Sequence, residues 1–253
     1  MSALRVVDTG LAPARWNIAM TAALAELHGT DKIPDTLRFQ RFETCVLVGR
    51  NQDVGREARI GRCREKGVAL ARRLTGGGAV YMDAGILSWE IVAGRKRFGR
   101  DLAEAAKAIC SAVADGLATL GVRAEFSPPN AIVAEGRKLS GASGYFEGTT
   151  LVHEGTVLVD FDIRDMADVL RPPAAADPAL LARRVTSLAE LLGKAPAIDE
   201  VRRAIAAGLA RRFDFSMFPA PLSTREFSLA EALHAAEFGS DRFVFGEDAR
   251  IVA

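Results

Sequence analysis

Two arginines followed by a run of glycine form the stretch of this sequence that is best suited to bind an anion. Residues 71–81 read Ala-Arg-Arg-Leu-Thr-Gly-Gly-Gly-Ala-Val-Tyr, with consecutive glycines at 76–78. Glycine lets the backbone adopt positive φ and approach a ligand closely, so that amide N–H groups can surround an anion. Arginine adds forked N–H donors that suit phosphate. The alternative is a glycine-rich turn with exposed arginines, and the segment matches neither the P-loop nor the dinucleotide-binding pattern.

A lysine ahead of small residues forms the second candidate. Residues 136–144 read Gly-Arg-Lys-Leu-Ser-Gly-Ala-Ser-Gly, and only six of the 33 basic residues in the chain are lysines. The ammonium group of Lys138 could therefore contact a ligand that lies on the surface left open by the small side chains. The alternative is a solvated hairpin lysine, since exposed charges of this kind contribute little to stability.

A third stretch, at residues 153–158, reads His-Glu-Gly-Thr-Val-Leu. It lacks the second histidine of the zinc metalloprotease motif, and three histidines in the whole chain argue against a histidine-rich metal centre. A Ser140 or Ser143 nucleophile paired with His153 is a further alternative, although the spacing is not that of a nucleophile elbow.

Composition excludes several classes of protein. The 253 residues are 49% hydrophobic and 26% charged, with a net charge of +1. Such a chain has no global field to attract nucleic acid or an anionic membrane. Its three cysteines are far apart and form no CxxC pair, which excludes a disulfide framework and a thiolate zinc site. There is no apolar run of about 20 residues and no signal-peptide pattern, so we expect a cytoplasmic protein.

Hydrophobic periodicity predicts helices at residues 16–28, 56–66 and 102–120, and a later helix whose apolar residues recur every four positions from Val201 to Phe213. Strands are predicted at 45–48, 79–81, 86–92 and 151–159. A hairpin turned by Glu135-Gly136 joins 132–134 to the strand that starts at Lys138. The chain is predicted to become helical beyond Pro172-Pro173. This order indicates an α+β fold with a mixed, largely antiparallel sheet flanked by helices, not repeated βαβ units.

In this order, the three stretches resemble the catalytic domain of the lipoate–protein ligase A family, which lies within the biotin/lipoate ligase and octanoyltransferase superfamily. Further matches are residues 16–19 (Trp-Asn-Ile-Ala), 48–52 (Val-Gly-Arg-Asn-Gln), Asn130 and 184–188 (Arg-Val-Thr-Ser-Leu). The resemblance implies a fold like the catalytic domains of class II synthetases and biotin ligases. It corresponds to a short form without the large C-terminal accessory domain. We expect the catalytic domain at residues 1–195, with a helical extension at 196–253 packed on it.

The resemblance also implies a reaction. Family members use ATP and Mg²⁺ to activate lipoate to lipoyl-AMP and then transfer the lipoyl group to a lysine of a lipoyl-domain or lipoate-binding carrier protein. A short member works alone or with a separate accessory ligase subunit. By position, Lys138 would be the catalytic residue that contacts the adenylate phosphate and the acyl carbonyl, and Asp83 would assist the metal. The residues implied to bind the nucleotide or the acyl group are Arg73, Gly76, Gly77, Gly78, Ala79, Val80, Tyr81, Asn130, Ser140, Gly141, His153, Gly155 and Thr156.

The sequence departs from the family pattern at a few positions. Gln40 stands where an aromatic residue often lines the acyl pocket, and Ala131 replaces an aspartate. Two alternatives therefore stay open. An octanoyl or lipoyl transferase between carrier proteins would use a cysteine thioester, yet no cysteine follows Cys110. A non-catalytic lipoyl-adenylate-binding module would bind ligand without releasing pyrophosphate. Biotin ligase is disfavoured because its Gly-Arg-Gly-Arg signature is absent.

Overall fold

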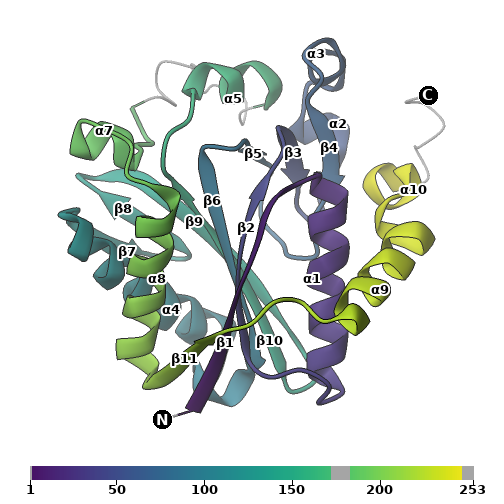
Figure 1. Cartoon of the computed structure of the whole chain (residues 1–253). Coiled ribbons are helices and arrows are strands. Elements are labelled where there is room, and N and C mark those ends of the chain that lie inside the picture. The colour runs from purple at the N-terminus through teal and green to yellow at the C-terminus, as the bar shows by residue number, and fades with distance from the viewer. Residues whose placement is uncertain (1, 172–182, 247–253) are drawn as a thin grey trace.

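A mixed sheet of eight strands forms the centre of the molecule in the computed structural model, which describes residues 2–171 and 183–246 (Figure 1). Within these residues β11, β1 and β2 run parallel, and every further pairing in the sheet is antiparallel. In spatial order the strands are β11 (Phe215–Pro219), β1 (Ser2–Ala12), β2 (Thr36–Phe42), β6 (Ile86–Gly94), β10 (Thr150–Leu158), β9 (Arg137–Glu147), β8 (Ala131–Ala134) and β7 (Ala124–Ser127).

A second, smaller sheet carries the glycine-rich segment. It has the order β4 (Ala69–Arg72), β3 (Cys45–Val48) and β5 (Val80–Met82). Residues 73–79, which we call the glycine loop, connect β4 to β5. The small sheet shares a hydrophobic cluster with helix α1 (Ala14–Gly29). The glycine loop therefore lies on the α1 side of the large sheet.

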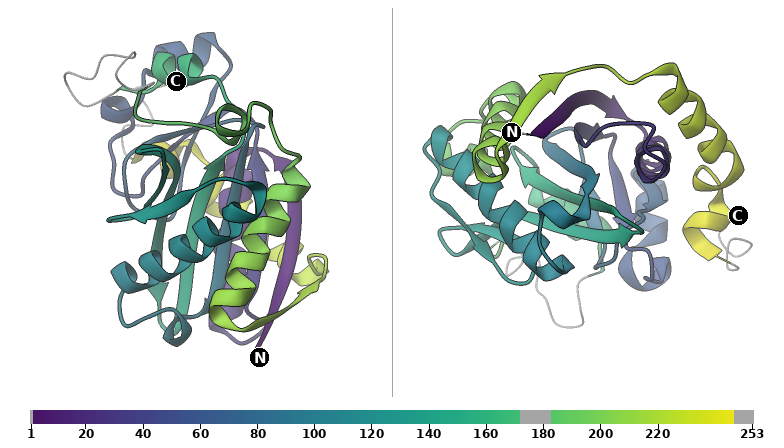
Figure 2. Two further views of the ribbon diagram at one scale, coloured as in Figure 1. Left: turned by 90° about the vertical axis from the view of Figure 1, so that its left-hand side faces the viewer. Right: turned by 90° about the horizontal axis from the view of Figure 1, so that it is seen from below.

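Helices cover both faces of the large sheet, as the view from below in Figure 2 shows. On one face, α4 (Leu102–Leu117) and α8 (Ile198–Phe213) bury the odd-numbered residues of β6, including Trp89. On the other face, α1 and α9 (Thr224–Leu233) pack against Val92 and Val152. This alternation follows from the two-residue period of a strand. The shorter helical elements are α2 (Val54–Glu57), α3 (Ile60–Glu65), η1 (Arg95–Arg97), η2 (Ala118–Leu120), α5 (Ile163–Val169), α7 (Leu188–Leu192), η3 (His234–Phe238) and α10 (Asp241–Phe245).

The predicted fold class is confirmed, and several predicted elements differ. The strands predicted at 79–81 and 86–92 do not pair with each other, because β5 joins β3 in the small sheet while β6 joins the large one. The helix predicted at 56–66 is two short helices, α2 and α3. The unit β1–α1–β2 is a parallel crossover, a connection that the sequence did not indicate. Pro172-Pro173 lies outside the described residues.

The segment after residue 195 contributes more than helices. Strand β11 pairs with β1 at the edge of the large sheet, and α8 packs on α4. The helices α4 and α8 approach so closely that a Cβ at Gly208 would lie 2.0 Å from the carbonyl oxygen of Ala112. Among the described residues, no helix has the length and apolar character needed to cross a membrane.

Candidate active site

The glycine loop rests directly on the end of β3. A Cβ atom at Gly49 would lie only 1.9 Å from the carbonyl oxygen of Gly77, so this contact requires glycine. Gly77 itself has a φ of +93°, which an L side chain rarely adopts. The Arg50 amide donates to the carbonyl of Thr75 at 2.9 Å. The loop is therefore held in one position by backbone contacts that side chains would obstruct.

The buried guanidinium of Arg73 is hydrogen-bonded to backbone carbonyls of the loop and of β3. Its nitrogens donate to the carbonyl oxygens of Leu47 (3.0 Å), Gly76 (2.7 Å) and Gly78 (2.8 Å), and Nε donates to the hydroxyl of Thr75. Four of its five N–H donors are thus used inside the protein. In this arrangement the side chain of Arg73 shapes the loop, and its contact with phosphate stays a prediction.

The backbone N–H groups of the glycine loop differ in whether they have hydrogen-bond partners. The N–H groups of Gly76, Gly77 and Gly78 donate to no other group in the part of the chain that the structure describes. The amide of Ala79 donates to the carboxylate of Glu57 at 2.7 Å. Gly76, Gly77 and Gly78 are exposed, so their amides, beside carbonyls that Arg73 draws inward, are accessible to an anion.

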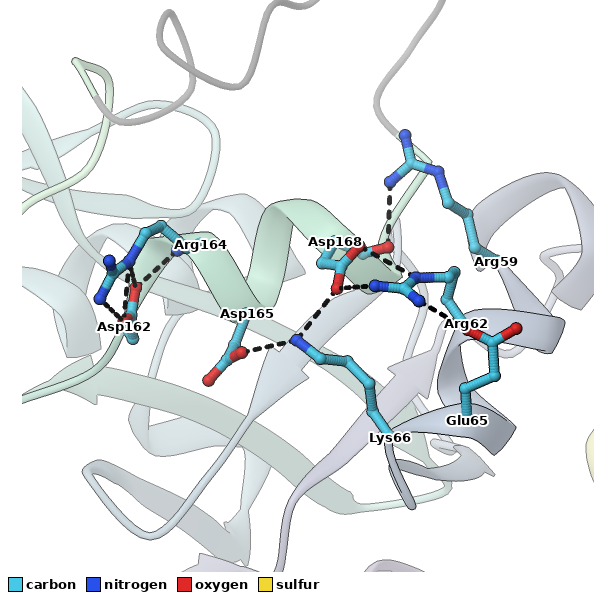
Figure 3. A network of polar contacts seen from close by, with 8 residues as sticks. All are labelled: Arg59, Arg62, Glu65, Lys66, Asp162, Arg164, Asp165 and Asp168. Carbon is cyan, nitrogen blue, oxygen red and sulfur yellow. Dashed lines mark hydrogen bonds and ion pairs between the residues drawn. The ribbon is translucent and has the colours of Figure 1, made fainter.

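The segment that supplies Glu57 is fastened to α5 by ion pairs (Figure 3). Arg62 and Lys66 contact the carboxylate of Asp168 at 2.7 and 3.0 Å, and Lys66 contacts Asp165 at 2.8 Å. Hydrogen bonds from Arg62 and Lys66 lower the pKa of Asp168 to about 2. These pairs are partly exposed, so they fix the position of α3 more than they stabilise the protein.

Lys138 stands at the beginning of β9, beside an irregularity in the pairing with β8. Its Nζ lies 2.9 Å from where a Cβ of Gly141 would be, so the side chain folds over the small residues of its own strand. Although the residue as a whole is exposed, partial burial of the ammonium group and the nearby charge of Arg73 lower its pKa. No carboxylate among the described residues pairs with it. An unpaired cation beside Arg73 is a group ready to receive an anion.

His153 of β10 is buried on the face of the large sheet that α4 and α8 cover, where it meets Trp89. Its ring stacks on Trp89 with the ring centroids 5.6 Å apart, and neither ring nitrogen has a hydrogen-bond partner among the described residues. Burial lowers its pKa to about 4, so the ring is neutral at pH 7. No hydrogen bond joins it to Ser140 or Ser143 within the described part of the chain, so the serine–histidine nucleophile is not assembled.

A cavity of about 240 Å³ links His153 to the glycine loop. It passes between the loop, the start of α4 and the part of β9 around Ser143 and Gly144. Asn130 borders it and donates through Nδ2 to the carbonyl of Ala142 at 2.6 Å. The residues that line the cavity are Gly76, Gly77, Leu102, Ala103, Ala106, Asn130, Ser143, Gly144 and His153.

Three of the remaining predicted residues lie on the neighbouring strands β9 and β10. Thr156 lies near Gly141, to whose carbonyl it donates at 3.5 Å, and Gly155 makes room for Trp89, 2.4 Å from a would-be Cβ. Ser140 is buried beside them.

Val80 and Tyr81 follow the loop into β5, and Tyr81 packs in a hydrophobic cluster. Asp83 lies beyond the far end of β5, where its carboxylate accepts from the amide of Gly85 at 2.8 Å. The described residues contain no group of three or more His, Cys, Asp or Glu placed to hold a metal.

The structure shows a polar contact at the loop, between Thr75 and Glu154, that the sequence did not predict. The hydroxyl of Thr75 donates to the carboxylate of Glu154, and it accepts from Ser143 at 2.8 Å. Thr75 and Glu154 lie inside stretches already singled out. No local pattern indicated that they meet, because 79 positions separate them.

Comparison with known proteins identifies the family. A model of the lipoyl protein ligase A/B catalytic domain matches residues 13–210. Octanoyltransferase LipM of Symbiobacterium thermophilum is 29% identical over 267 aligned residues, covering 94% of this chain and 97% of the relative. Octanoyltransferase LipM of Bacillus subtilis is 24% identical and covers 94% and 96% of the two chains.

Solved structures show the same fold. A bi-partite lipoate protein ligase from Thermoplasma acidophilum has a TM-score of 0.87 at 24% identity and covers 97% of both chains. A lipoate-protein ligase A bound with ATP has a TM-score of 0.84 at 24% identity, covering 97% of this chain and 98% of the other. Because the family model spans most of the sequence and includes the glycine loop, Lys138 and His153, the chain belongs to the lipoyl protein ligase A/B catalytic-domain family.

Proposed function

We propose that this protein is an ATP-dependent lipoate–protein ligase, which activates lipoate to lipoyl-AMP and transfers the lipoyl group to a lysine of a carrier protein. The family establishes that the chain is related to enzymes that handle lipoyl and octanoyl groups. The choice of ATP-dependent activation comes from the nucleophiles that the site lacks and from the cations and amides that it contains.

The single observation that carries the proposal concerns the cysteines. Cys45, Cys63 and Cys110 are the three cysteines of the chain, and each is fully buried. Burial raises the pKa of all three thiols, that of Cys110 to about 12. A thioester intermediate needs a thiolate at the reacting carbonyl, and none of these groups lines the cavity or lies in the glycine loop. Activation of a free acid by ATP requires no such nucleophile.

The polar groups of the site suit adenylate formation. Attack of the lipoate carboxylate on the α-phosphorus of ATP forms the acyl phosphate bond and expels pyrophosphate. Negative charge on the phosphate oxygens then faces the Lys138 ammonium, while the free amides of residues 76–78 offer donors to the phosphates. Donors fixed in place before reaction stabilise such charge without reorganising. In the second step, Lys138 would stabilise the carbonyl oxygen as the carrier lysine displaces AMP.

We assign no protein metal site to this reaction. Asp83 lies at the wrong end of β5 to approach the loop, so Mg²⁺ enters the proposal only as the counter-ion of the triphosphate. The acceptor is proposed to be a lipoyl domain or lipoate-binding carrier. The Thermoplasma acidophilum lipoylation system consists of a bi-partite ligase and its E2 lipoyl domain, so a separate accessory subunit is tested alongside the acceptor.

The test is pyrophosphate release from ATP with lipoate or octanoate, with and without a lipoyl-domain protein and an accessory ligase subunit. We expect release that depends on the free acid, and one lipoylated carrier per pyrophosphate in the presence of acceptor. Binding of ATP and lipoate without pyrophosphate release in any arm would instead indicate a non-catalytic lipoyl-adenylate-binding module.

Carrier-to-carrier octanoyl transfer is the second candidate, because the relatives with 24–29% identity are named octanoyltransferases. Its test is incubation with an octanoylated carrier and an unmodified lipoyl domain, without ATP. Transfer under these conditions that persists after dialysis of nucleotides would overturn the ligase proposal. A variant with all three cysteines replaced by alanine should keep ATP-dependent activity if the ligase proposal is correct.

A further inference from the structure

A row of polar residues crosses four neighbouring strands on the face that carries the site. Arg38 of β2 is paired in register with Glu90 of β6, Glu90 with Glu154 of β10, and Glu154 with Ser143 of β9. Direct cross-strand partners on one face lie side by side, so the row is continuous. Arg38 and Glu90 are fully buried, with Nε and Oε1 3.0 Å apart. The row thus runs from the interior beside α1 to β9, the strand that carries Lys138.

The row ends on the glycine loop. Glu154 can only accept hydrogen bonds when ionised, so the Thr75 hydroxyl must donate to it. The two lone pairs of that hydroxyl then accept from Ser143 at 2.8 Å and from Nε of Arg73 at 3.2 Å. This uses the full hydrogen-bonding capacity of Thr75. The carboxylate of Glu154 therefore decides which group donates and which accepts in the hydrogen bonds that join it to Thr75, Ser143 and Arg73.

Glu154 also interacts with the glycine loop electrostatically, through Arg73. Nε of Arg73 lies 4.0 Å from a carboxylate oxygen of Glu154, and both side chains are mostly buried. Arg73 carries a positive charge that its contacts with loop carbonyls do not neutralise. A buried cation without a nearby anion is costly, and Glu154, with a smaller effect from Glu57, offsets the burial of Arg73 under the loop.

We propose that Glu154 is a positioning residue for the glycine loop: through Thr75 and Arg73 it holds the three free amides in the arrangement that receives phosphate. The inference rests on the proposed function for the identity of that phosphate as part of ATP. Glu154 touches no reacting atom, and its effect is on nucleotide affinity. Loss of its charge leaves Arg73 without this neighbouring carboxylate, which loosens the loop.

The test compares Glu154→Gln, Thr75→Val, Thr75→Ser and the double variant Glu154→Gln/Thr75→Val with the unmodified protein. Glu125→Gln, at an exposed position of β7, is the matched control. Hydrogen exchange of peptides covering residues 71–81 is measured without ligand. Dissociation constants for ATP are measured by calorimetry, together with melting temperatures.

We expect Glu154→Gln and Thr75→Val each to weaken ATP binding at least tenfold and to speed exchange in residues 71–81, with exchange in β6 unchanged. Thr75→Ser should bind ATP within about threefold of the unmodified protein, because it keeps the hydroxyl. The double variant should bind ATP more weakly than either single variant, since Thr75→Val removes the hydroxyl contact and Glu154→Gln removes the charge that faces Arg73.

Two results would overturn the inference. One is ATP affinity and loop exchange in Glu154→Gln equal to those of the Glu125→Gln control. The other is faster exchange throughout β6 and β10 with a large fall in melting temperature, which would make Glu154 a general stabilising residue. Failure of the ligase proposal is recognised separately, because the unmodified protein would then release no pyrophosphate from ATP, whereas the exchange measurement needs no nucleotide.

Discussion

The substitution Gly49→Ala gives the sharpest test of how the glycine loop is held. A Cβ at this position would lie 1.9 Å from the carbonyl oxygen of Gly77 and 3.3 Å from Nη2 of Arg73. Close carbon–oxygen contacts in proteins occur at about 3.3 Å. The loop and β3 must therefore separate by about 1.4 Å. Gly49 does not have positive φ, so alanine introduces a collision without backbone strain.

The separation has a calculable effect on both stability and activity. The oxygen that must move belongs to the backbone, so no side-chain rotation relieves the collision. Overpacking of this kind costs about 1–3 kcal/mol of unfolding free energy. Displacement of binding groups by about 1 Å can reduce turnover about 100-fold. We therefore expect a folded protein with a lower melting temperature and about a hundredth of the ATP-dependent pyrophosphate release.

The assay measures lipoate-dependent pyrophosphate release, ATP affinity and a melting curve for the same preparation. Gly61→Ala is the control, because a Cβ there meets no atom within 4 Å and the residue lies in α3. It should melt at the same temperature or higher, since alanine favours helix over glycine. Turnover within twofold of the unmodified protein in Gly49→Ala, with an unchanged melting temperature, would refute the argument that this contact shapes the loop.

Substitutions at three further positions test other parts of the structure. Lys138→Ala should slow pyrophosphate release about 100-fold or more with the melting temperature nearly unchanged, and Lys138→Arg should also fail; normal turnover in Lys138→Ala would remove this residue from the mechanism. The pKa of His153 in the folded protein, about 4, is below the ordinary value of 6.5, so the unfolded chain takes up the proton first. The free energy of unfolding therefore falls by up to about 3 kcal/mol as pH falls from 6.5 to 4. His153→Phe should remove that part of the loss in denaturant titrations at several pH values, and an identical pH profile would contradict the burial argument. Gly208→Ala should lower the unfolding free energy by about 1–3 kcal/mol, measured by urea titration, because its Cβ would meet the Ala112 carbonyl; it should leave ATP affinity unchanged.

Features that depend on a few neighbouring residues could be predicted from the sequence. The turn at Glu135-Gly136 is confirmed, with both residues at positive φ, and the hairpin places Lys138 at the start of β9. The long helix predicted at 102–120 is α4 followed by the 3-10 element η2, and Gly121, also with positive φ, ends it. These predictions succeed because glycine conformations and helix periodicity are set by local sterics.

Strand partners could not be predicted in the same way. Ser2–Ala12 and Phe215–Pro219 pair in parallel although they lie at opposite ends of the described chain. The short strand β5 leaves its neighbour in sequence, β6, and joins a different sheet. Strand pairing depends on which buried faces meet after the chain folds, and a single sequence contains no record of those contacts.

The sequence by itself determined the chemical inventory of the site: a glycine loop, a lysine beside small residues and no cysteine after Cys110. Tertiary structure alone decided how those groups are used. It turned the donors of Arg73 toward loop carbonyls, left the ammonium of Lys138 without a carboxylate partner among the described residues, and brought Glu154 to Thr75. The physical reason is that buried polar groups must find partners, and which partners come within reach depends on packing between strands far apart in the chain.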